Sequence, residues 1–395
     1  MFKKRTIRDV DVAGKRVLAR VDFNVPLTED GKVADDTRIK AVLPTISYLI
    51  EMGAKVILIS HLGRPKGKVD NAVRMDPVAK RLSGLIGRKV QKTNETVTNK
   101  VTEAVAHLQN GDVLLLENVR FNPGENKNNP KFAKQLASLA DIFVNDAFGT
   151  AHRNHASTVG VTNYLPAYSG FLLEKEVCEL SKLLENPNKP FMAVLGGNKV
   201  SDKIGVIDKF LDTVDAILTG GGMCFTFLKA KGFNIGSSIC QENELEHSLK
   251  MFEKAKRNGV DFLLPVDVVV AESLASDAKY KVVSVENIPA GWMGLDIGPD
   301  TVKIYKDMLN RAKTIFWNGP MGVFEKEPFS QGTRAVATAM AKSQATTIVG
   351  GGDSDAALKK YGLGDEISFV STGGGASLKL LGGELLPGVE SLLDK

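Results

Sequence analysis

Short apolar runs rich in β-branched residues recur along the whole chain and predict strands. Near-continuous hydrophobicity over a few residues is typical of strands that are buried on both faces of a sheet. The runs lie at residues 16–23, 55–59, 113–116, 141–144, 191–195, 216–218, 262–270, 314–317, 346–349 and 367–370. Because parallel sheets are covered on both faces, strands of this kind favour parallel sheets.

Segments with the helical spacing of apolar residues lie between these runs. They are residues 37–52, 76–86, 131–139, 201–211, 242–256, 299–311 and 329–342. Alternation of strand and helix on this scale is typical of parallel sheets with helices on both faces. The pattern therefore predicts a doubly wound α/β architecture.

The length of the chain suggests two domains, and one segment marks the junction between them. The 395 residues exceed the usual size of a single domain, which is roughly 100 to 200 residues. Residues 170–185 have the spacing of an amphipathic helix, with Pro166 before them and the proline-rich segment 186–190 after them. We therefore expect a first domain at residues 1–169, a joining helix at 170–186, and a second domain from residue 187.

Composition and charge exclude several classes of protein. Hydrophobic residues make up 43% of the chain and charged residues 25%, which are ordinary values for a globular protein and argue against intrinsic disorder. The 51 basic and 46 acidic residues give a net charge of +5, too small for a surface that coats nucleic acid or an anionic membrane. We expect neither as a partner.

The cysteines and the N-terminal segment indicate the compartment. Cys178, Cys224 and Cys240 have no C-x-x-C spacing, so they predict neither a disulfide framework nor a zinc site. Charged residues, among them Asp9 and Asp11, interrupt what would be the apolar core of a signal peptide. The apolar runs are also shorter than the roughly 18 residues that span a bilayer. The expected location is the cytoplasm, without a membrane segment.

Glycine gives the sharpest clue to a ligand. The chain has 38 glycines among 395 residues, above the usual share of about 7%, and every adjacent pair lies after the predicted junction. The clusters are at residues 196–197, 220–222, 350–352, 373–375 and 382–383. Most of them follow predicted strands, where parallel sheets bind ligands and where N–H groups without a neighbouring Cβ approach phosphate. A tight turn explains any single cluster, but several in one half favour a phosphate site.

Named nucleotide motifs are absent. The segment nearest to a P-loop, residues 63–69 (GRPKGKV), is one residue short and lacks a hydroxyl after its second lysine. None of the triple glycines continues into G-x-G-x-x-G, and protein-kinase signatures are missing. A nicotinamide dehydrogenase would explain doubly wound domains, but it would be expected to carry the missing glycine fingerprint.

Cationic and polar groups follow the predicted strands of the first half. Segments 21–24, 60–64, 117–120 and 145–153 each close a strand and carry such groups, and Arg38 opens the first helical segment. If the sheet is parallel, these groups converge at one edge as an anion pocket, where the forked donors of arginine suit phosphate or carboxylate. An alternative interpretation is a non-catalytic nucleotide-binding module. It would account for the glycine clusters but not for these arginines.

Two other patterns have structural interpretations beside the functional ones. His152 and His155 have H-x-x-H spacing, but no third ligand is evident, so we do not expect a metal there. Met223, Phe225 and Phe227 follow a triple glycine and would suit an adenine pocket, although hydrophobic core is the default for such residues.

Taken together, these residues show that the sequence resembles the phosphoglycerate kinase family over essentially the whole chain. The matching segments are long and highly specific. They are residues 20–27 (RVDFNVPL), 60–64 (SHLGR), 145–153 (NDAFGTAHR), 220–223 (GGGM), 291–296 (GWMGLD), 317–320 (WNGP), 350–354 (GGGDS) and 371–377 (STGGGAS). Three positions depart from the family pattern, namely Asn198, Cys224 and Asp355.

The resemblance implies a two-domain organisation and a set of partners. It implies two Rossmann-like domains, with the phosphoglycerate in the first and Mg-ADP or Mg-ATP in the second, at residues 187–378. The C-terminal tail, residues 379–395, is expected to return to the first domain. The expected partners are 3-phosphoglycerate or 1,3-bisphosphoglycerate and ATP or ADP, bound by a monomer.

The resemblance also implies the site residues. For the three-carbon acid they are Asp22, Phe23, Asn24, Arg38, His61, Leu62, Gly63, Arg64, Arg120 and Arg153. For the nucleotide they are Lys199, Lys203, Gly294, Asn318, Glu325, Gly351, Gly352, Asp353 and Ser354, and Asp353 would hold Mg²⁺. The expected catalytic residues are Arg38, Lys199 and Gly374.

The implied reaction is a glycolytic, reversible phosphoryl transfer between 1,3-bisphosphoglycerate and ADP, giving 3-phosphoglycerate and ATP. Its nucleophile is a carboxylate, which is ionised at pH 7, so the reaction needs no general base. It needs cationic stabilisation of the charge that spreads over the transferring phosphoryl group. We expect the two domains to close about the joining helix when both substrates are present.

Overall fold

The computed structural model describes residues 2–275 and 277–395, and the chain divides into two compact units. The first contains the chain up to Cys178 together with Leu385–Lys395, and the second contains Glu179–Glu384. Helix α6 (Phe171–Glu185) crosses this boundary. The C-terminal residues pack within the first unit, where the amide of Leu393 donates to the carbonyl of Ala167 at 3.0 Å.

A six-stranded parallel sheet forms the centre of the first unit. Its strand order is β3-β4-β2-β1-β5-β6, and every pair of neighbours runs parallel. The strands are β1 (Arg16–Val21), β2 (Lys55–Ile59), β3 (Val90–Lys92), β4 (Val113–Leu115), β5 (Ile142–Asp146) and β6 (Ala167–Ser169). Strands β1, β2 and β5 are buried over nearly their whole length, as their apolar sequences predict.

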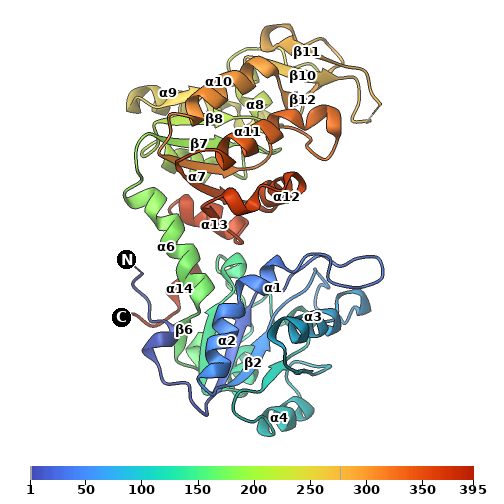
Figure 1. Cartoon of the computed structure of the whole chain (residues 1–395), viewed down its shortest axis with the longest axis vertical. Coiled ribbons are helices and arrows are strands. Elements are labelled where there is room, and N and C mark those ends of the chain that lie inside the picture. Colours follow the sequence, from blue (N-terminus) through green and yellow to red (C-terminus); the bar gives the residue numbers. More distant parts are fainter. Residues whose placement is uncertain (1, 276) are drawn as a thin grey trace. The chain divides into compact units, whose positions relative to one another are not determined.

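Helices cover this sheet through amphipathic faces. They are α1 (Thr37–Ala41), α2 (Leu43–Glu51), α3 (Asp76–Ile86), α4 (Asn99–Ala106), α5 (Pro130–Ala137) and α14 (Pro387–Glu390). On one face, Ile46 and Leu49 of α2 and Val78 and Leu82 of α3 form a buried core with strand residues such as Val56. Figure 1 shows α2 and α3 beside β2. The apolar spacing of these helices therefore fixes which side they turn to the sheet.

The single helix expected at residues 37–52 is interrupted at Val42. Pro44 lies in the first turn of α2, and it has no N–H to donate to the carbonyl of Lys40. A proline is tolerated in the first turn of a helix but not in its interior, so the segment forms two short helices instead of one.

The second unit is also built on a six-stranded parallel sheet. Its order is β15-β14-β13-β7-β8-β9, and reading the strands in chain order gives 3-2-1-4-5-6 from one edge to the other, which is the order of dinucleotide-binding domains. The strands are β7 (Phe191–Leu195), β8 (Ala216–Thr219), β9 (Asp261–Leu263), β13 (Thr314–Asn318), β14 (Thr346–Gly350) and β15 (Phe369–Val370). The expected doubly wound α/β architecture is thus confirmed.

The helices of the second unit follow its strands. They are α7 (Ile204–Phe210), α8 (Met223–Ala230), α9 (Leu245–Asn258), α10 (Pro299–Leu309), α11 (Gln331–Ala341), α12 (Gly352–Tyr361) and α13 (Gly375–Leu381). Side chains of α10 and α11, among them Tyr305, Leu309, Val336 and Met340, are buried in one core with Trp317 of β13. Figure 1 shows these helices in the green to red part of the chain.

The expected single strand at residues 262–270 is wrong, because two strands occupy this region. Strand β9 ends at Leu263 and β10 (Asp267–Ala271) begins after Pro265, which has no N–H for a sheet ladder. Strand β10 belongs to a separate antiparallel sheet with β11 (Tyr280–Ser284) and β12 (Met293–Ile297). The apolar pattern did not predict this small sheet, since a buried run has the same composition in either kind of sheet.

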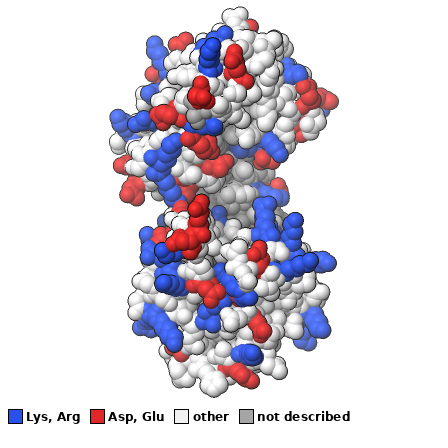
Figure 2. Space-filling view, turned by 90° about the vertical axis from the view of Figure 1, so that its right-hand side faces the viewer, with Lys and Arg blue, Asp and Glu red and all other residues white. Residues whose placement is uncertain are grey.

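The mixture of basic and acidic side chains on the surface agrees with the modest net charge of +5. Figure 2 shows Lys and Arg interspersed with Asp and Glu over the face in view. Among the described residues, no helix combines the length and apolar character that crossing a membrane requires.

The start of helix α6 is held by a buried carboxyl group. The amide of Leu173 donates to Asp146 Oδ1 at 2.9 Å, and the amide of Phe171 donates to the hydroxyl of Thr45 at 2.9 Å. A Cβ on Gly170 would lie 2.4 Å from the carboxyl carbon of Asp146, so the chain passes close to this group. Burial raises the pKa of Asp146 to about 7.

We expect the stability of the protein to fall as pH rises from 5 to 7, in part because of Asp146. Up to about pH 6 the folded state keeps the Asp146 proton, and it loses about half of it at pH 7, whereas the unfolded state, with a pKa of 3.8, has lost it throughout. Each proton of this kind gives a slope of roughly 1.4 kcal/mol per pH unit. Asp146→Asn should remove about that slope in urea unfolding measured at pH 5, 6 and 7.

Asp141→Asn is the matched control for this measurement. Its side-chain hydrogen bond with Arg16 lowers the pKa of Asp141, so its contribution is lost only as pH falls below 4. The wild-type slope between pH 5 and 7 should therefore persist in this variant. An equally steep slope in Asp146→Asn would show that Asp146 is ionised in the folded protein.

Candidate functional site

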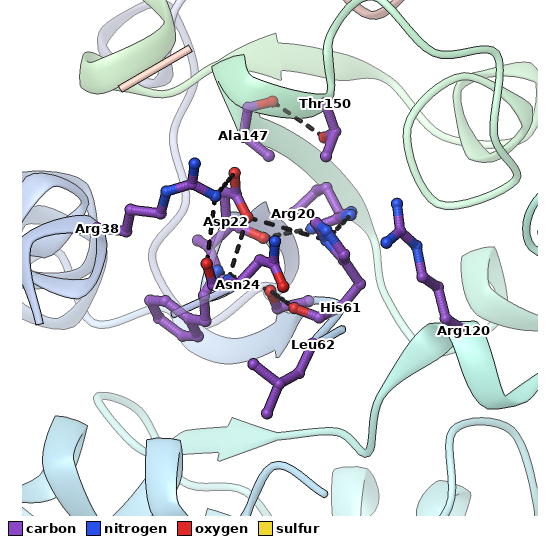
Figure 3. A network of polar contacts seen from close by, with 12 residues as sticks. Arg20, Asp22, Asn24, Arg38, His61, Leu62, Arg120, Ala147 and Thr150 are labelled. Carbon is purple, nitrogen blue, oxygen red and sulfur yellow. Dashed lines mark hydrogen bonds and ion pairs between the residues drawn. The ribbon is translucent and has the colours of Figure 1, made fainter. Parts of the chain in front are cut away.

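The carboxyl ends of the first sheet's strands bring a group of polar side chains together. Asp22 and Asn24 follow β1, His61 follows β2, and Arg120 follows β4, while Arg38 comes from α1. Because these strands are parallel, their ends meet at one edge of the sheet. Figure 3 shows these side chains directed toward one another.

Hydrogen bonds order the side chains at this edge. Arg38 Nη1 donates to Asp22 Oδ2 at 3.1 Å and to the carbonyl of Asn24 at 3.3 Å (Figure 3). The side-chain oxygen of Asn24 accepts the amide of Gly63 at 2.8 Å, which joins the loop after β1 to the loop after β2. Arg38 is therefore held at the edge although its side chain remains 34% exposed.

The loop after β2 depends on a glycine and on two residues from the loop after β4. Gly63 has φ +61°, and a Cβ there would lie 2.8 Å from Val73 Cγ1, so a side chain is excluded. The carbonyl of Gly63 accepts from Arg120 Nη1 at 2.8 Å. The side-chain Nδ2 of Asn118 donates to the carbonyls of Leu62 and Val73 at 2.7 and 2.9 Å. These contacts fix the position of the loop.

Four arginines, Arg20, Arg38, Arg120 and Arg153, form what we call the arginine cluster. Their charges act on one another. Burial lowers the pKa of Arg120 to about 10, and the charges of Arg153 and Arg20 contribute in the same direction. Burial together with all four arginines also lowers the pKa of His61 well below its ordinary value. The carboxylates of Asp22 and Glu125 oppose this positive charge but do not balance four cations.

Two N–H groups of the cluster are left without partners. The Nε atoms of Arg120 and Arg153 are buried, and neither has a hydrogen-bond partner among the described residues. A buried, unsatisfied donor on a charged group is costly, and an anionic ligand with several oxygens would satisfy both. Unpaired donors and excess positive charge together make this edge an anion-binding site.

Some residues that the sequence assigned to this site have other environments. The side chains of Phe23 and Leu62 are buried in the core on this side of the sheet, so only their backbone atoms face outward from it. The amide of Phe23 donates to the hydroxyl of Ser60 at 2.8 Å. Arg64 is exposed and is the most solvent-accessible arginine of the predicted set.

A second site lies at the carboxyl ends of β7, β13 and β14 in the second unit. It is a cavity of about 240 Å³. The residues that line it are Gly197, Asn198, Lys199, Asp202, Lys203, Asn318, Gly319, Gly351, Gly352, Asp353 and Ser354. Strands β7 and β13 are neighbours at the point where the strand order reverses, which is where open α/β sheets bind ligands.

Backbone and side-chain contacts shape this cavity. Asn318 Nδ2 donates to the carbonyl of Gly350 at 2.7 Å, and the amide of Gly319 donates to Ser354 Oγ at 2.7 Å. Gly351 has φ +98°, and a Cβ there would lie 2.8 Å from Asn318 Nδ2. Burial lowers the pKa of Lys203, while the charges of Asp202 and Asp353 act in the opposite direction.

Three residues of the second unit that were assigned to the nucleotide or to catalysis lie outside the lining of this cavity. They are Gly294, Glu325 and Gly374. Gly294 is buried, and a Cβ there would lie 1.9 Å from the ring of Phe225, so its lack of a side chain serves packing. Glu325 is exposed. Met223, Phe225 and Phe227 are buried, which favours the core interpretation of these residues.

The described residues contain no group of three or more His, Cys, Asp or Glu side chains that could hold a metal ion. The H-x-x-H pair is not part of such a group, and the Nδ1 atom of His155 lies 3.6 Å from Glu125 Oε1. Mg²⁺ at phosphate sites usually takes one or two carboxylates, water and phosphate oxygens. Asp353 and Asp202 in the cavity fit that arrangement.

Sequence reasoning missed several residues that the structure places at the two sites. Arg20 is fully buried and contacts His61, and Ser157 and Glu125 lie behind it. The available signal was a charged residue within an otherwise apolar strand, because such a residue needs buried partners. At the second site the missed lining residues are Asn198, Asp202 and Gly319, whereas Gly197 belongs to one of the predicted glycine clusters.

Comparison with known proteins identifies what the chain is similar to. The family model described as phosphoglycerate kinase matches residues 7–384. A phosphoglycerate kinase of Pelotomaculum thermopropionicum is 55% identical over 392 residues, which are 99% of this chain and 100% of that protein.

Solved structures agree with these sequence matches. The structure of phosphoglycerate kinase from Coxiella burnetii has a TM-score of 0.87 at 46% identity and covers 98% of both chains. The crystal structure of phosphoglycerate kinase from Pyrococcus horikoshii has a TM-score of 0.86 at 35% identity, again over 98% of both chains.

Proposed function

The chain belongs to the phosphoglycerate kinase family, and on that premise we propose how its two sites transfer a phosphoryl group. The enzyme is a phosphotransferase of glycolysis that acts between 1,3-bisphosphoglycerate and ADP, with 3-phosphoglycerate and ATP as products. The observation that carries the proposal is the arginine cluster, whose buried Nε donors of Arg120 and Arg153 lack partners among the described residues. A phosphorylated carboxylic acid supplies the oxygens that these donors need.

The three-carbon acid binds at the arginine cluster. Arg38, Arg120 and Arg153 contact its phosphate and carboxylate oxygens, with the exposed Arg64 as a further cation. Asp22, Asn24 and His61 offer hydrogen bonds to its polar groups, and Gly63 lets the backbone approach. Phe23 and Leu62 contribute through their backbone, because their side chains are in the core.

The nucleotide binds at the cavity of the second unit. Lys199 and Lys203 neutralise its phosphates, while Asn318, Gly351, Gly352 and Ser354 provide polar and backbone contacts around them. Gly294 and Glu325 are assigned to parts of the nucleotide that extend beyond this cavity.

Magnesium accompanies the nucleotide as part of the substrate. Asp353 is the carboxylate that would hold it, and the ion would neutralise phosphate charge during transfer. The two carboxylates that line the cavity, Asp202 and Asp353, fit an ion whose other ligands are phosphate oxygens and water.

The acceptor needs no catalytic base. The carboxylate of 3-phosphoglycerate is ionised at neutral pH and attacks directly. Catalysis then depends on stabilising the negative charge that spreads over the transferring phosphoryl group. We assign this role to Arg38, to Lys199 and to the backbone N–H of Gly374.

Transfer also requires the two units to close around both substrates. Arg38 belongs to one unit and Lys199 to the other, yet the reacting atoms must come within about 3.5 Å. Contacts of both residues with one transferring group stabilise the closed form only when both substrates are present. Helix α6, which belongs to both units, is the element about which closure occurs. We further assign the enzyme to the cytoplasm as a monomer.

The experiment that tests this function is a coupled assay containing 3-phosphoglycerate and ATP, with and without Mg²⁺. We expect activity only when both substrates and the metal are present. Asp353→Asn should shift the Mg²⁺ concentration for half-maximal activity upward, since one ligand charge is lost while the shape of the side chain is kept. An unshifted titration would assign the metal to phosphates and water alone.

Arg38→Ala should lose about 100- to 1000-fold in kcat, because a preorganised donor to the developing charge is removed. The KM for nucleotide should stay nearly unchanged, since Arg38 belongs to the other unit. Arg16→Ala is the control, because Arg16 lies at the opposite end of β1 and pairs with Asp141. Retention of more than about a tenth of wild-type turnover by Arg38→Ala would remove this residue from catalysis.

Lys199→Ala and Lys203→Ala should each reduce transfer by about tenfold or more, since both side chains line the nucleotide cavity. Lys66→Ala and Lys68→Ala serve as controls from the loop whose spacing resembles a P-loop without matching it. These two variants should retain nearly full activity in the coupled assay. Equal losses in both pairs would mean that the triphosphate binds elsewhere.

Small-angle scattering tests domain closure. The four states are free protein, protein with 3-phosphoglycerate, protein with Mg-ADP, and the unreactive complex with both. We expect the radius of gyration to decrease fully only in the last state, because only that complex engages both units. A radius that is the same in all four states would contradict the closure model.

A further inference from the structure

Arg20, the fully buried member of the arginine cluster, lies at the centre of a network of buried polar groups. Its side chain is fully buried, although it belongs to the otherwise apolar strand β1. Arg20 Nε donates to Ser157 Oγ at 2.9 Å, and Arg20 Nη1 donates to the carbonyl of Val21. Arg20 Nη2 lies 3.1 Å from His61 Nδ1. Figure 3 shows the two side chains next to each other. A buried guanidinium group with this set of contacts requires a structural or functional reason.

The hydrogen bonds behind Arg20 have a fixed direction. Ser157 Oγ donates to Glu125 Oε1 at 2.7 Å, so its lone pairs are available to Arg20 Nε. The amide of Ser157 donates to Glu125 Oε2 at 3.0 Å, and Glu125 is itself 1% exposed. The carboxylate therefore orients the hydroxyl, and the hydroxyl orients the guanidinium group.

The direction of these hydrogen bonds determines which nitrogen of the His61 ring carries the proton. A guanidinium group has only donors, so the Nδ1 atom that faces Arg20 at 3.1 Å must present its lone pair. The carboxylate oxygen Asp22 Oδ1 is 3.9 Å from the same nitrogen, beyond hydrogen-bond range. In the neutral ring the proton then resides on Nε2, which forms no hydrogen bond with any described residue.

We propose that Arg20, held by Ser157 and Glu125, is a positioning residue that keeps His61 in its neutral Nε2–H form. A neutral histidine can donate from either ring nitrogen. Arg20 thereby makes Nε2 of His61 the hydrogen-bond donor at the edge of the sheet. The charges of the arginine cluster, which lower the pKa of His61, act in the same sense by disfavouring the doubly protonated ring.

The consequence for the substrate rests on the proposed function. A neutral Nε2–H donor adds a directional hydrogen bond to an anionic oxygen without adding a further cation to four neighbouring arginines. If the proton were on Nδ1 instead, Nε2 would present a lone pair to the anion and repel it. Arg20 thus affects substrate binding through His61 and not by direct contact.

The first test uses the wild-type, ligand-free protein labelled with ¹⁵N-histidine. Two-bond ¹H–¹⁵N correlations distinguish a protonated from an unprotonated ring nitrogen, and His61→Gln assigns the signal among the five histidines. We expect an unprotonated Nδ1 and a protonated Nε2 from pH 6 to 8. A proton on Nδ1, or titration of the ring within that range, would overturn the proposal.

Variants then test whether Arg20 is the cause. Arg20→Met removes the donors, so the ring should become a mixture of both neutral forms, and Arg20→Lys should restore the Nε2–H form in part. Ser157→Ala leaves Arg20 in place but removes the hydroxyl that accepts from its Nε, so the ring should shift toward the same mixture of neutral forms. This variant keeps the proposal testable even where Arg20→Met does not fold. A pure Nε2–H ring in either loss variant would contradict the role of Arg20.

Thr158→Val is the matched control for Ser157→Ala. The Thr158 hydroxyl is buried beside Ser157, but it has no hydrogen-bond partner among the described residues, so its loss should leave the His61 signals unchanged. A change in this control equal to that in Ser157→Ala would attribute the effect to local packing and overturn the proposal.

Kinetics separates this inference from the proposed function. In Arg20→Met the KM for 3-phosphoglycerate should rise about tenfold, while the KM for nucleotide stays unchanged. Arg20→Lys should recover part of this loss. A changed ring with an unchanged KM would still support the positioning of His61 by Arg20, but it would remove His61 from the substrate site.

Discussion

Parallel pairing of the central strands is the constraint on which both sites depend. Because β1 pairs in parallel with β2 and β5, the residues after these strands meet at one edge, and the arginine cluster forms there. The same rule acts in the second unit, where β7 lies between β8 and β13 and the glycine-rich turns after the strands surround a cavity. Each site therefore lies beside the pair of strands at which the order of its sheet reverses.

Positive charge at the first edge is kept in place by buried partners. Guanidinium groups near one another repel, and taking them out of water adds a further cost, so the edge is stable only with hydrogen bonds to each group. Asp22 accepts a hydrogen bond from Arg38, and the carbonyl of Gly63 accepts one from Arg120. Ser157, which itself donates to Glu125, accepts one from Arg20. The donors left over, on Arg120 and Arg153, are those that an anionic substrate would satisfy. Stability and binding are thus opposed at this edge, as is usual for a preorganised site.

Much of the fold could be predicted from the sequence because buried parallel strands are almost continuously apolar. The strands at residues 55–59 and 191–195 and the helix at 76–86 have the predicted bounds. The errors have local causes: Pro44 divides one helix, and Pro265 separates β9 from β10. The antiparallel sheet of β10, β11 and β12 was not predicted, because apolar composition does not specify the direction of a neighbouring strand.

The sequence by itself determined the architecture, the family, and which loops carry the cationic and glycine-rich segments, since these follow from local patterns and long specific matches. Only the tertiary structure decided which side chains touch. Arg20 and Ser157 are 137 residues apart, and Arg20 and His61 are 41 apart, yet each pair is in hydrogen-bond contact. The same holds for Gly294, where the absence of a side chain leaves room for the ring of Phe225. Such contacts depend on the register of paired strands and on the packing of distant loops, neither of which is encoded in the spacing of residues along one segment.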